Sequence, residues 1–132
     1  MSKTENKWRD SVLVPFFKKM GIVYFIKEAG TIRGLPDIVA VYRSTPIFLE
    51  VKRGKSCLTH PRTRLQEYQM KKLRDAGAKC WFIYPENARE VMKDLFILML
   101  TEKKITEIEF SHALLVIVEA FPSSCPSLNE LE

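Results

Sequence analysis

Apolar residues recur at every fourth position near the start of the chain, and this spacing predicts a helix over residues 4–20. The residues on its apolar side are Trp8, Val12, Phe16 and Met20. Thr4 is expected to cap the first turn, and Gly21 is expected to end the helix. Pro15 lacks a backbone donor, so we expect a kink at that position.

Three strand-like runs follow the first helix. Residues 21–30 are rich in β-branched and aromatic residues and are closed by a glycine. Residues 38–42 and 47–52 are two apolar runs, separated only by the turn residues 43–46. Two strands joined by so short a turn are predicted to form an antiparallel hairpin.

The second half of the chain returns to helical patterns, with one strand between them. The predicted elements are a loop at 53–62, a helix at 63–76 that Gly77 ends, a strand at 78–84 and a helix at 85–104. Residues 105–121 fit either a strand or a helix, and residues 122–132 are typical of a loose tail. Tyr68, Trp81 and Phe82 fall at core spacing within these elements.

The order of the elements is helix, strand, strand, strand, helix, strand, helix. A three-strand meander followed by a helical crossover to a fourth strand gives a mixed sheet with helices on its faces, which is an α/β fold. The 132 residues suit a single domain. We assign this domain to residues 1–121 and expect residues 122–132 to be flexible.

Composition favours a folded protein of the cell interior. Hydrophobic residues make up 46% of the chain and charged residues 28%, which suffices to fill a core. No apolar run approaches the roughly twenty residues that span a bilayer, and the polar start lacks the apolar middle of a secretion signal. The three cysteines are odd in number and form no zinc-like grouping. Reduced thiols and a soluble, cytoplasmic protein without a membrane partner are therefore expected.

Positive charge is concentrated in one segment. Lys and Arg outnumber Asp and Glu by 21 to 16, and residues 51–66 contain no acid. Besides Lys52, the basic residues of this segment are Arg53, Lys55, His60, Arg62 and Arg64. Such local density favours contact with the phosphates of a nucleic acid, and a solvated loop is the structural alternative. Lys27 and Arg33 are weaker candidates for the same contact.

Three charged residues interrupt the apolar runs of the predicted hairpin. Side chains two apart on a strand point to the same face, so Glu50 and Lys52 project together while Val51 points the other way. Hairpin pairing brings the start of the first strand beside the end of the second, so Asp37 is expected close to both. A turn acid and a surface charge pair are the structural alternatives, but charges placed so tightly among core residues indicate a function.

This arrangement suits a divalent metal. Mg²⁺ takes oxygen ligands and keeps several waters, so Asp37 and Glu50 suffice to hold it, with the Val51 carbonyl as a third ligand. The metal is expected to polarise a phosphate oxygen and activate a bound water. Lys52 would orient that water or stabilise the developing charge. Hydrolysis of a phosphodiester uses all of these groups.

The segments GLPDI and EVK, joined by a short hairpin, resemble the motif of the PD-(D/E)XK nuclease superfamily, with Asp37, Glu50 and Lys52 in its positions. More narrowly, the chain is similar to the virus-type replication-repair nuclease family, VRR-NUC. A glycine precedes the PD, a basic loop follows the lysine, and a glutamine-bearing helix ends in a glycine-containing turn. The resemblance covers about residues 5–84. It implies a restriction-endonuclease-like αβββαβ core, with residues 85–121 as a C-terminal helical extension.

The resemblance also implies further site residues and partners. Glu5 in the first helix is expected to complete the metal site, directly or through water, and a role at the helix dipole is its alternative. Gln66, or Gln69 one turn later, takes the place of the family's glutamine. The implied cofactor is Mg²⁺, with Mn²⁺ as a substitute. The implied substrate is branched or structured DNA, such as a four-way junction, cut by a homodimer.

The final third of the chain carries no motif, and its apolar residues have two interpretations. They form the subunit contact of the homodimer, or they pack on the chain's own sheet. They comprise Phe96, Ile97, Leu98, Met99, Leu100 and residues 114–118. Two other functions stay open: a flap, end-processing or restriction-like nuclease on the same scaffold, and a non-catalytic nucleic-acid-binding protein.

Overall fold

The computed structural model describes residues 3–27, 35–59 and 61–122, with residues 59, 61 and 62 described by their backbone alone. At its centre is a mixed sheet of four strands in the spatial order β1-β2-β3-β4. The strands are β1 (Val23–Ile26), β2 (Ile38–Tyr42), β3 (Thr45–Val51) and β4 (Lys79–Ile83). β1, β2 and β3 form an antiparallel meander, and β4 pairs parallel to β3. The predicted α/β class and mixed sheet are therefore confirmed.

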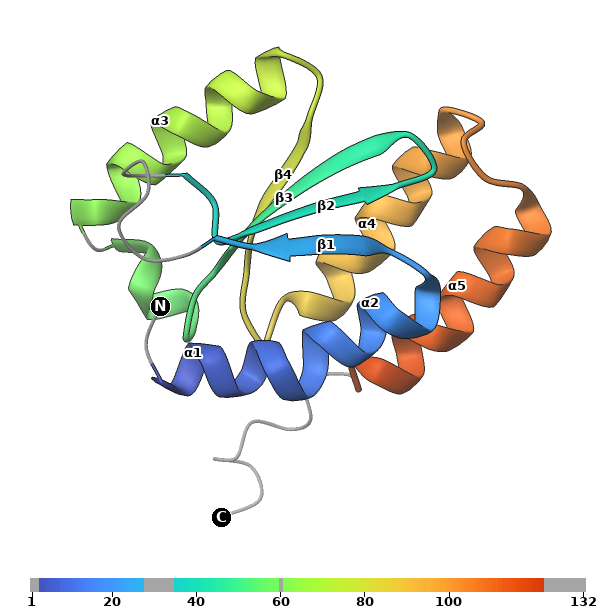
Figure 1. Cartoon of the computed structure of the whole chain (residues 1–132), viewed down its shortest axis with the longest axis horizontal. Coiled ribbons are helices and arrows are strands. Elements are labelled where there is room, and N and C mark those ends of the chain that lie inside the picture. Colours follow the sequence, from blue (N-terminus) through green and yellow to red (C-terminus); the bar gives the residue numbers. More distant parts are fainter. Residues whose placement is uncertain (1–2, 28–34, 60, 123–132) are drawn as a thin grey trace.

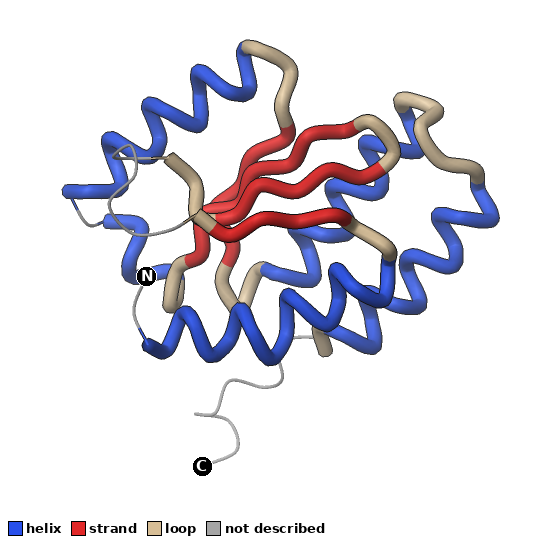
Figure 2. Tube along the Cα trace, viewed as in Figure 1, coloured by secondary structure: helices blue, strands red, loops and turns tan. Residues whose placement is uncertain are grey.

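Helices cover both sides of the sheet. They are α1 (Lys3–Trp8), the π-helical turn η1 (Arg9–Leu13), α2 (Val14–Met20), the 3-10 helix η2 (Lys55–Thr59), α3 (Pro61–Asp75), α4 (Ala88–Thr101) and α5 (Glu107–Ala120). α3 lies on one side of the sheet and packs on β4, whereas α2, α4 and α5 gather on the other side (Figures 1 and 2). The crossover through α3 allows β4 to run parallel to β3.

The first predicted helix is present but interrupted. The Val14 N–H donates to the Arg9 carbonyl five residues back, so the helix widens to a π-helical turn just ahead of Pro15. The irregularity expected at Pro15 therefore lies in the preceding turn. Thr4 is wrong as an N-cap, because it lies inside α1 rather than before it. Gly21 ends α2 as predicted, in the left-handed conformation with φ 72°.

The predicted hairpin forms with a tighter turn than expected. Tyr42 pairs with Thr45, so only Arg43 and Ser44 connect β2 to β3. Both have positive φ, 49° and 62°, which is the backbone required at the two central positions of a type I′ turn. The last two residues of the turn predicted at 43–46 therefore belong to β3, because a type I′ turn follows the twist of the flanking strands.

Neither turn residue is a glycine, although left-handed backbone costs an L-residue about 1 kcal/mol. Ser44→Gly is therefore expected to raise the free energy of unfolding by about 0.5–1 kcal/mol, measured by urea denaturation. Ser111→Gly, at an exposed position in the regular helix α5, is the matched control and is expected to lower it by a similar amount. A loss of stability in Ser44→Gly would contradict the turn geometry.

α3 begins and ends at residues that suit helix termini. It starts at Pro61, two residues earlier than predicted, because proline is accommodated in a first helical turn. The segment predicted as a loop at 53–62 therefore contains the start of α3 and also the short helix η2. Gly77 follows α3 with φ 102°, which confirms it as the helix stop.

Side-chain hydrogen bonds lie at the starts of the last two helices. α4 begins at Ala88, later than predicted, because the Asn87 side chain accepts the Tyr84 N–H at 2.8 Å and holds a turn before the helix. The ambiguous segment that follows α4 is the helix α5. Its first turn carries a capping box, in which Thr106 Oγ1 accepts the Glu109 N–H and Glu109 Oε1 accepts the Thr106 N–H.

The main core lies between the sheet and the helices α2, α4 and α5. Its largest fully buried residues are Leu13, Phe16, Phe17, Ile38, Ile47, Leu49, Ile83, Met92, Leu95, Phe96 and Met99. For Phe96, Met99, Val116 and Ile117 the interpretation as a subunit contact is wrong, because their side chains pack in this core. No helix in the described part of the chain is both long and apolar enough to cross a membrane.

The three aromatic residues expected at core spacing have different surroundings. Trp81 packs against the core as predicted. Tyr68 is wrong as a core residue, because it lies on the outer side of α3, where it is 60% exposed and has Lys72 Nζ 5.4 Å from its ring. Phe82 is half-buried and lies beneath the amine of Lys52.

Candidate functional site

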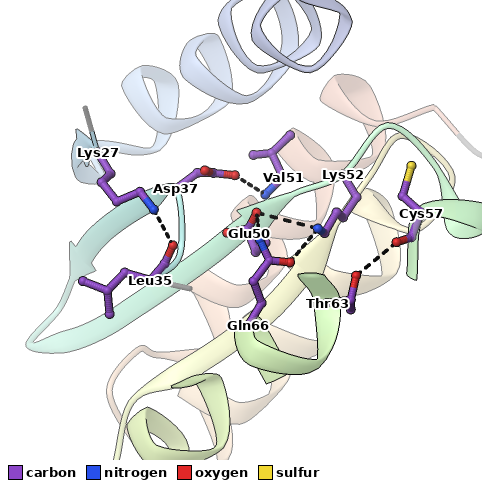
Figure 3. A network of polar contacts seen from close by, with 9 residues as sticks. All are labelled: Lys27, Leu35, Asp37, Glu50, Val51, Lys52, Cys57, Thr63 and Gln66. Carbon is purple, nitrogen blue, oxygen red and sulfur yellow. Dashed lines mark hydrogen bonds and ion pairs between the residues drawn. The ribbon is translucent and has the colours of Figure 1, made fainter. Parts of the chain in front are cut away.

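Two carboxylates meet at one end of the hairpin. Asp37 directly precedes β2, and Glu50 lies near the end of β3. Ile38 pairs with Leu49, so the next cross-strand position places Asp37 opposite Glu50. The two acids are only 8% and 4% exposed, and Asp37 Oδ2 accepts the Val51 N–H at 3.0 Å (Figure 3). The hairpin thus brings together the two acids that the sequence singled out.

Lys52 and Gln66 form a polar network with Glu50. Lys52 Nζ donates to Gln66 Oε1 at 2.6 Å, and Gln66 Nε2 donates to Glu50 Oε2 at 2.9 Å (Figure 3). The direct separation between Lys52 Nζ and Glu50 Oε2 is longer, at 3.9 Å. Gln66 therefore bridges the amine and the carboxylate, and it is Gln66 rather than Gln69 that makes these contacts.

The neighbouring strand β4 holds Lys52 from another direction. The Lys52 N–H donates to the Ile83 carbonyl at 2.8 Å, and Lys52 Nζ lies 5.7 Å from the centre of the Phe82 ring. A cation over an aromatic face gains about 0.5–2 kcal/mol, depending on its desolvation. Phe82 pairs in register with Glu50, but the sequence alone does not give the β3–β4 register, so this contact was missed.

Thr63 connects α3 to the basic segment and was also missed. Its side chain is nearly fully buried, and its hydroxyl donates to the Cys57 carbonyl at 3.1 Å (Figure 3). The Cys57 N–H in turn donates to the Gly54 carbonyl at 3.1 Å. These bonds attach the first turn of α3 to η2 and so fix the helix that presents Gln66. A threonine in the first turn of a helix gives no sequence signal for this contact.

Burial makes Glu50 a weak acid. Loss of hydration is the largest cause that raises the pKa of Glu50 from 4.5 to about 8, followed by the negative charge of the adjacent Asp37. The positive charges of Lys52 and Lys27 oppose this rise. The raised pKa means that Glu50 keeps its proton near neutral pH when no cation is bound.

This proton makes the stability of the protein depend on pH. Folded Glu50 keeps its proton to about pH 8 and the unfolded residue loses it near 4.5, so the free energy of unfolding falls as the pH rises between these values. In EDTA, we expect the wild type to lose on the order of 3 kcal/mol between about pH 5 and about pH 8, measured by urea denaturation.

Glu50→Gln is expected to remove most of this slope. Glu67→Gln, which removes an exposed acid on α3, is the control and keeps the wild-type slope. A flat wild-type profile, or an unchanged slope in Glu50→Gln, would contradict a protonated carboxyl at this position.

One oxygen of the pair lacks a donor. Among the residues that the structure describes, Glu50 Oε1 is the one buried side-chain oxygen or nitrogen without a hydrogen-bond partner. Ionised Glu50 leaves this oxygen unsatisfied, which is costly in a buried position. A divalent cation shared with Asp37 would satisfy it, since hard cations bind carboxylate oxygens. The donor set therefore fits Mg²⁺ or Mn²⁺.

Glu5 is half-buried in the first turn of α1. No group of three His, Cys, Asp or Glu side chains that could hold a metal ion occurs within residues 3–27, 35–59 and 61–122, so the role of Glu5 in the metal site stays a prediction. A cation held by Asp37 and Glu50 would complete its coordination with backbone carbonyls and water, as Mg²⁺ commonly does.

Basic side chains follow the network along the chain. Arg53, Lys55 and Arg64 are exposed: Arg53 precedes η2, Lys55 is its first residue, and Arg64 lies in the first turn of α3. The side chain of Arg62 lies outside the described residues, and so does the whole of His60. The positive charge available to a phosphate thus lies on the segment that also carries Lys52 and Gln66.

No protein-family model, curated protein or solved structure matches this chain. The chemistry of the site is therefore inferred from its own residues and geometry.

Proposed function

We propose that this protein is a divalent-metal-dependent endonuclease that hydrolyses phosphodiester bonds in DNA, on a restriction-endonuclease-like αβββαβ core of the VRR-NUC type. The main observation behind this proposal is the buried pair Asp37 and Glu50 beside the amine of Lys52. One oxygen of this pair, Glu50 Oε1, has no hydrogen-bond donor. A carboxyl with a strongly raised pKa beside a specific charge partner is typical of a functional site. The element order agrees with that core, with α4 and α5 as the C-terminal extension.

Asp37 and Glu50 hold the cation in this proposal, with the Val51 carbonyl as a third ligand. Val51 lies between Glu50 and Lys52 in β3, and its N–H already orients the Asp37 carboxylate. Bound Mg²⁺ or Mn²⁺ supplies Lewis acidity toward the phosphate. Because Glu50 must lose its proton to act as a ligand, metal affinity is expected to rise with pH up to about 8.

Lys52 stabilises charge at the phosphate, or orients the attacking water, and Gln66 positions it. The amine is 2.6 Å from Gln66 Oε1 and nearly buried, so it is fixed before substrate arrives. A preorganised cation stabilises charge that develops in the transition state without the cost of reorganising. Gln66 also donates to Glu50. By bridging the two groups, Gln66 keeps the Lys52 amine 3.9 Å from the Glu50 carboxylate, so they do not form a tight ion pair.

The exposed cations Arg53, Lys55 and Arg64 contact the DNA backbone in this proposal, with His60 and Arg62 as further candidates. Each phosphate contact adds to the salt dependence of binding, so DNA affinity is expected to fall steeply as salt rises. A non-catalytic nucleic-acid-binding protein is less well supported, because a binding module gains nothing from two buried acids next to a phosphate backbone.

A homodimer belongs to the proposal, because two symmetric cuts in a junction need two active sites. The final third still offers exposed apolar side chains for such a contact, namely Ile97, Leu98, Ile108, Leu115 and Val118. Sedimentation velocity is expected to give the mass of two chains. A mass equal to one chain would contradict the homodimer, but it would not affect the chemistry proposed for the single site.

The proposal is tested by offering the purified protein a four-way junction, a flap and a linear duplex, each with Mg²⁺, Mn²⁺ or EDTA. Cleavage is expected with either metal and not in EDTA. Paired symmetric nicks in the junction support the preference for branched DNA, which rests on the resemblance. Cutting only of flaps or ends would favour the other nuclease specificity, and tight binding without any cleavage would favour the non-catalytic protein.

A further inference from the structure

Lys27 forms two hydrogen bonds with the short segment that carries Asp37. It follows β1, and its backbone N–H donates to the Asp37 carbonyl at 2.7 Å, one position beyond the last β1–β2 pair. Its side-chain Nζ donates to the Leu35 carbonyl at 2.8 Å (Figure 3). One residue therefore holds the two carbonyls on either side of Pro36.

Asp37 is consequently fixed from two directions. Lys27 holds its backbone from the β1 side, while the Val51 N–H holds its carboxylate from the β3 side. Pro36 is buried and has no N–H, so it cannot donate a hydrogen bond to anchor this segment. The amine of Lys27 supplies a donor that the segment itself lacks.

This contact orients the Lys27 amine. The side chain is half-buried, and one of the three N–H donors of its amine is bonded to the Leu35 carbonyl, which directs the amine toward the Asp37 segment. Its charge also acts on Glu50, where it opposes the larger effect of burial on the pKa of that carboxyl. Lys27 thus contacts the Asp37 segment directly and reaches the second acid through its charge.

We propose that Lys27 is a positioning residue of the metal site, which holds the Leu35–Asp37 segment so that the Asp37 carboxylate stays opposite Glu50. This role rests on the proposed metal centre. Groups that hydrogen-bond to metal ligands and orient them commonly weaken metal binding about 10- to 100-fold when they are removed.

The first test measures Mn²⁺ binding to the full chain by titration calorimetry without DNA. Lys27→Met keeps the apolar stem and the backbone N–H but loses the amine, and we expect about tenfold weaker Mn²⁺ binding. Lys27→Arg keeps a charged donor and is expected to recover most of the affinity. Lys18→Met, at an exposed position in α2, removes the same charge and is expected to bind Mn²⁺ as the wild type does.

The second test separates positioning from phosphate contact. Lys27→Met is expected to need about tenfold more Mn²⁺ for half-maximal cleavage of a supercoiled plasmid, with an unchanged slope of log DNA affinity against log salt. A slope smaller by about one with unchanged Mn²⁺ dependence would identify a phosphate contact and overturn the positioning role. Thermal unfolding in EDTA checks that each variant folds, and Lys27→Leu, which likewise has no donor and is expected to show the same losses, replaces Lys27→Met if that variant does not.

Asp37→Asn distinguishes failure of this role from failure of the metal centre. If Asp37→Asn loses Mn²⁺ binding while Lys27→Met binds Mn²⁺ like the wild type, the centre stands and the role of Lys27 is overturned. If Asp37→Asn also binds Mn²⁺ like the wild type, the proposed centre is wrong and the role of Lys27 fails with it.

Discussion

Lys52→Met is expected to lower the rate of DNA cleavage at saturating Mg²⁺ by about 10²- to 10³-fold, because it removes the oriented cation next to the phosphate. Methionine keeps an unbranched stem of similar length against Phe82 but cannot donate to Gln66. Single-turnover cleavage of a supercoiled plasmid measures the effect. Asp37 and Glu50 remain, so Mg²⁺ binding is expected to persist.

The matched control for this variant is Lys104→Met, which removes an exposed lysine after α4. It is expected to cut at the wild-type rate. Normal cleavage by Lys52→Met would show that the amine has no part in the chemistry. A loss of Mg²⁺ binding equal to the loss of cleavage would place Lys52 in the support of the metal ligands instead.

Asp37→Asn is expected to abolish measurable cleavage and to weaken Mg²⁺ or Mn²⁺ binding by more than about 100-fold, because the site loses one of its two charged ligands. Asparagine can still accept the Val51 N–H, so the hairpin end is expected to keep its shape. Calorimetric titration with Mn²⁺ and plasmid cleavage measure the two effects.

The same variant is expected to unfold less readily than the wild type at about pH 8 in EDTA. The negative charge of Asp37 helps to raise the pKa of Glu50, so its removal lowers that pKa and relieves the repulsion between two ionised acids. Lost activity together with gained stability is a signature of a functional charge pair. Reduced stability together with normal metal binding would instead mark Asp37 as a structural residue.

The hairpin was predictable because two simple rules determine it: side chains alternate along a strand, and a short turn fixes which residues pair. Alternation along β3 puts Glu50 and Lys52 on one face, and pairing across the short turn puts Asp37 beside Glu50. Gln66 was named through the resemblance, and its contacts with both Lys52 and Glu50 place it beside these residues. The helix stops Gly21 and Gly77 followed from the backbone that only glycine adopts without strain.

Features that depend on tertiary pairing were not predictable in this way. Phe82 reaches Lys52 only because β4 pairs with β3 in one particular register. Lys27 was named as a weaker candidate for phosphate contact because it precedes the site in the sequence, which gives no sign that its amine bonds to the Leu35 carbonyl. The role of Glu5 as a third carboxylate stays a prediction, because Glu5 lies on a separate helix whose orientation the sequence does not fix.

The sequence does contain a signal for one element left open above and for one helix boundary that was placed too late. Thr106 and Glu109 have the spacing of a capping box ahead of an apolar run, which would have identified α5 as a helix. Pro61 marks a helix start in the same way. The apolar run in α4 has no comparable signal. Helical periodicity alone does not tell that Phe96 is buried in the core whereas Ile97 is exposed.

The central claim, a metal-dependent phosphodiesterase centred on Asp37 and Glu50, is tested most directly by the nicking of supercoiled plasmid as Mg²⁺ is titrated. The wild type is expected to nick the plasmid in proportion to bound Mg²⁺ and to stop when EDTA is added. Glu50→Gln, which keeps the shape of the side chain, is expected to be inactive at every Mg²⁺ concentration. Nicking by Glu50→Gln at the wild-type rate, or nicking by the wild type in EDTA, would contradict the claim.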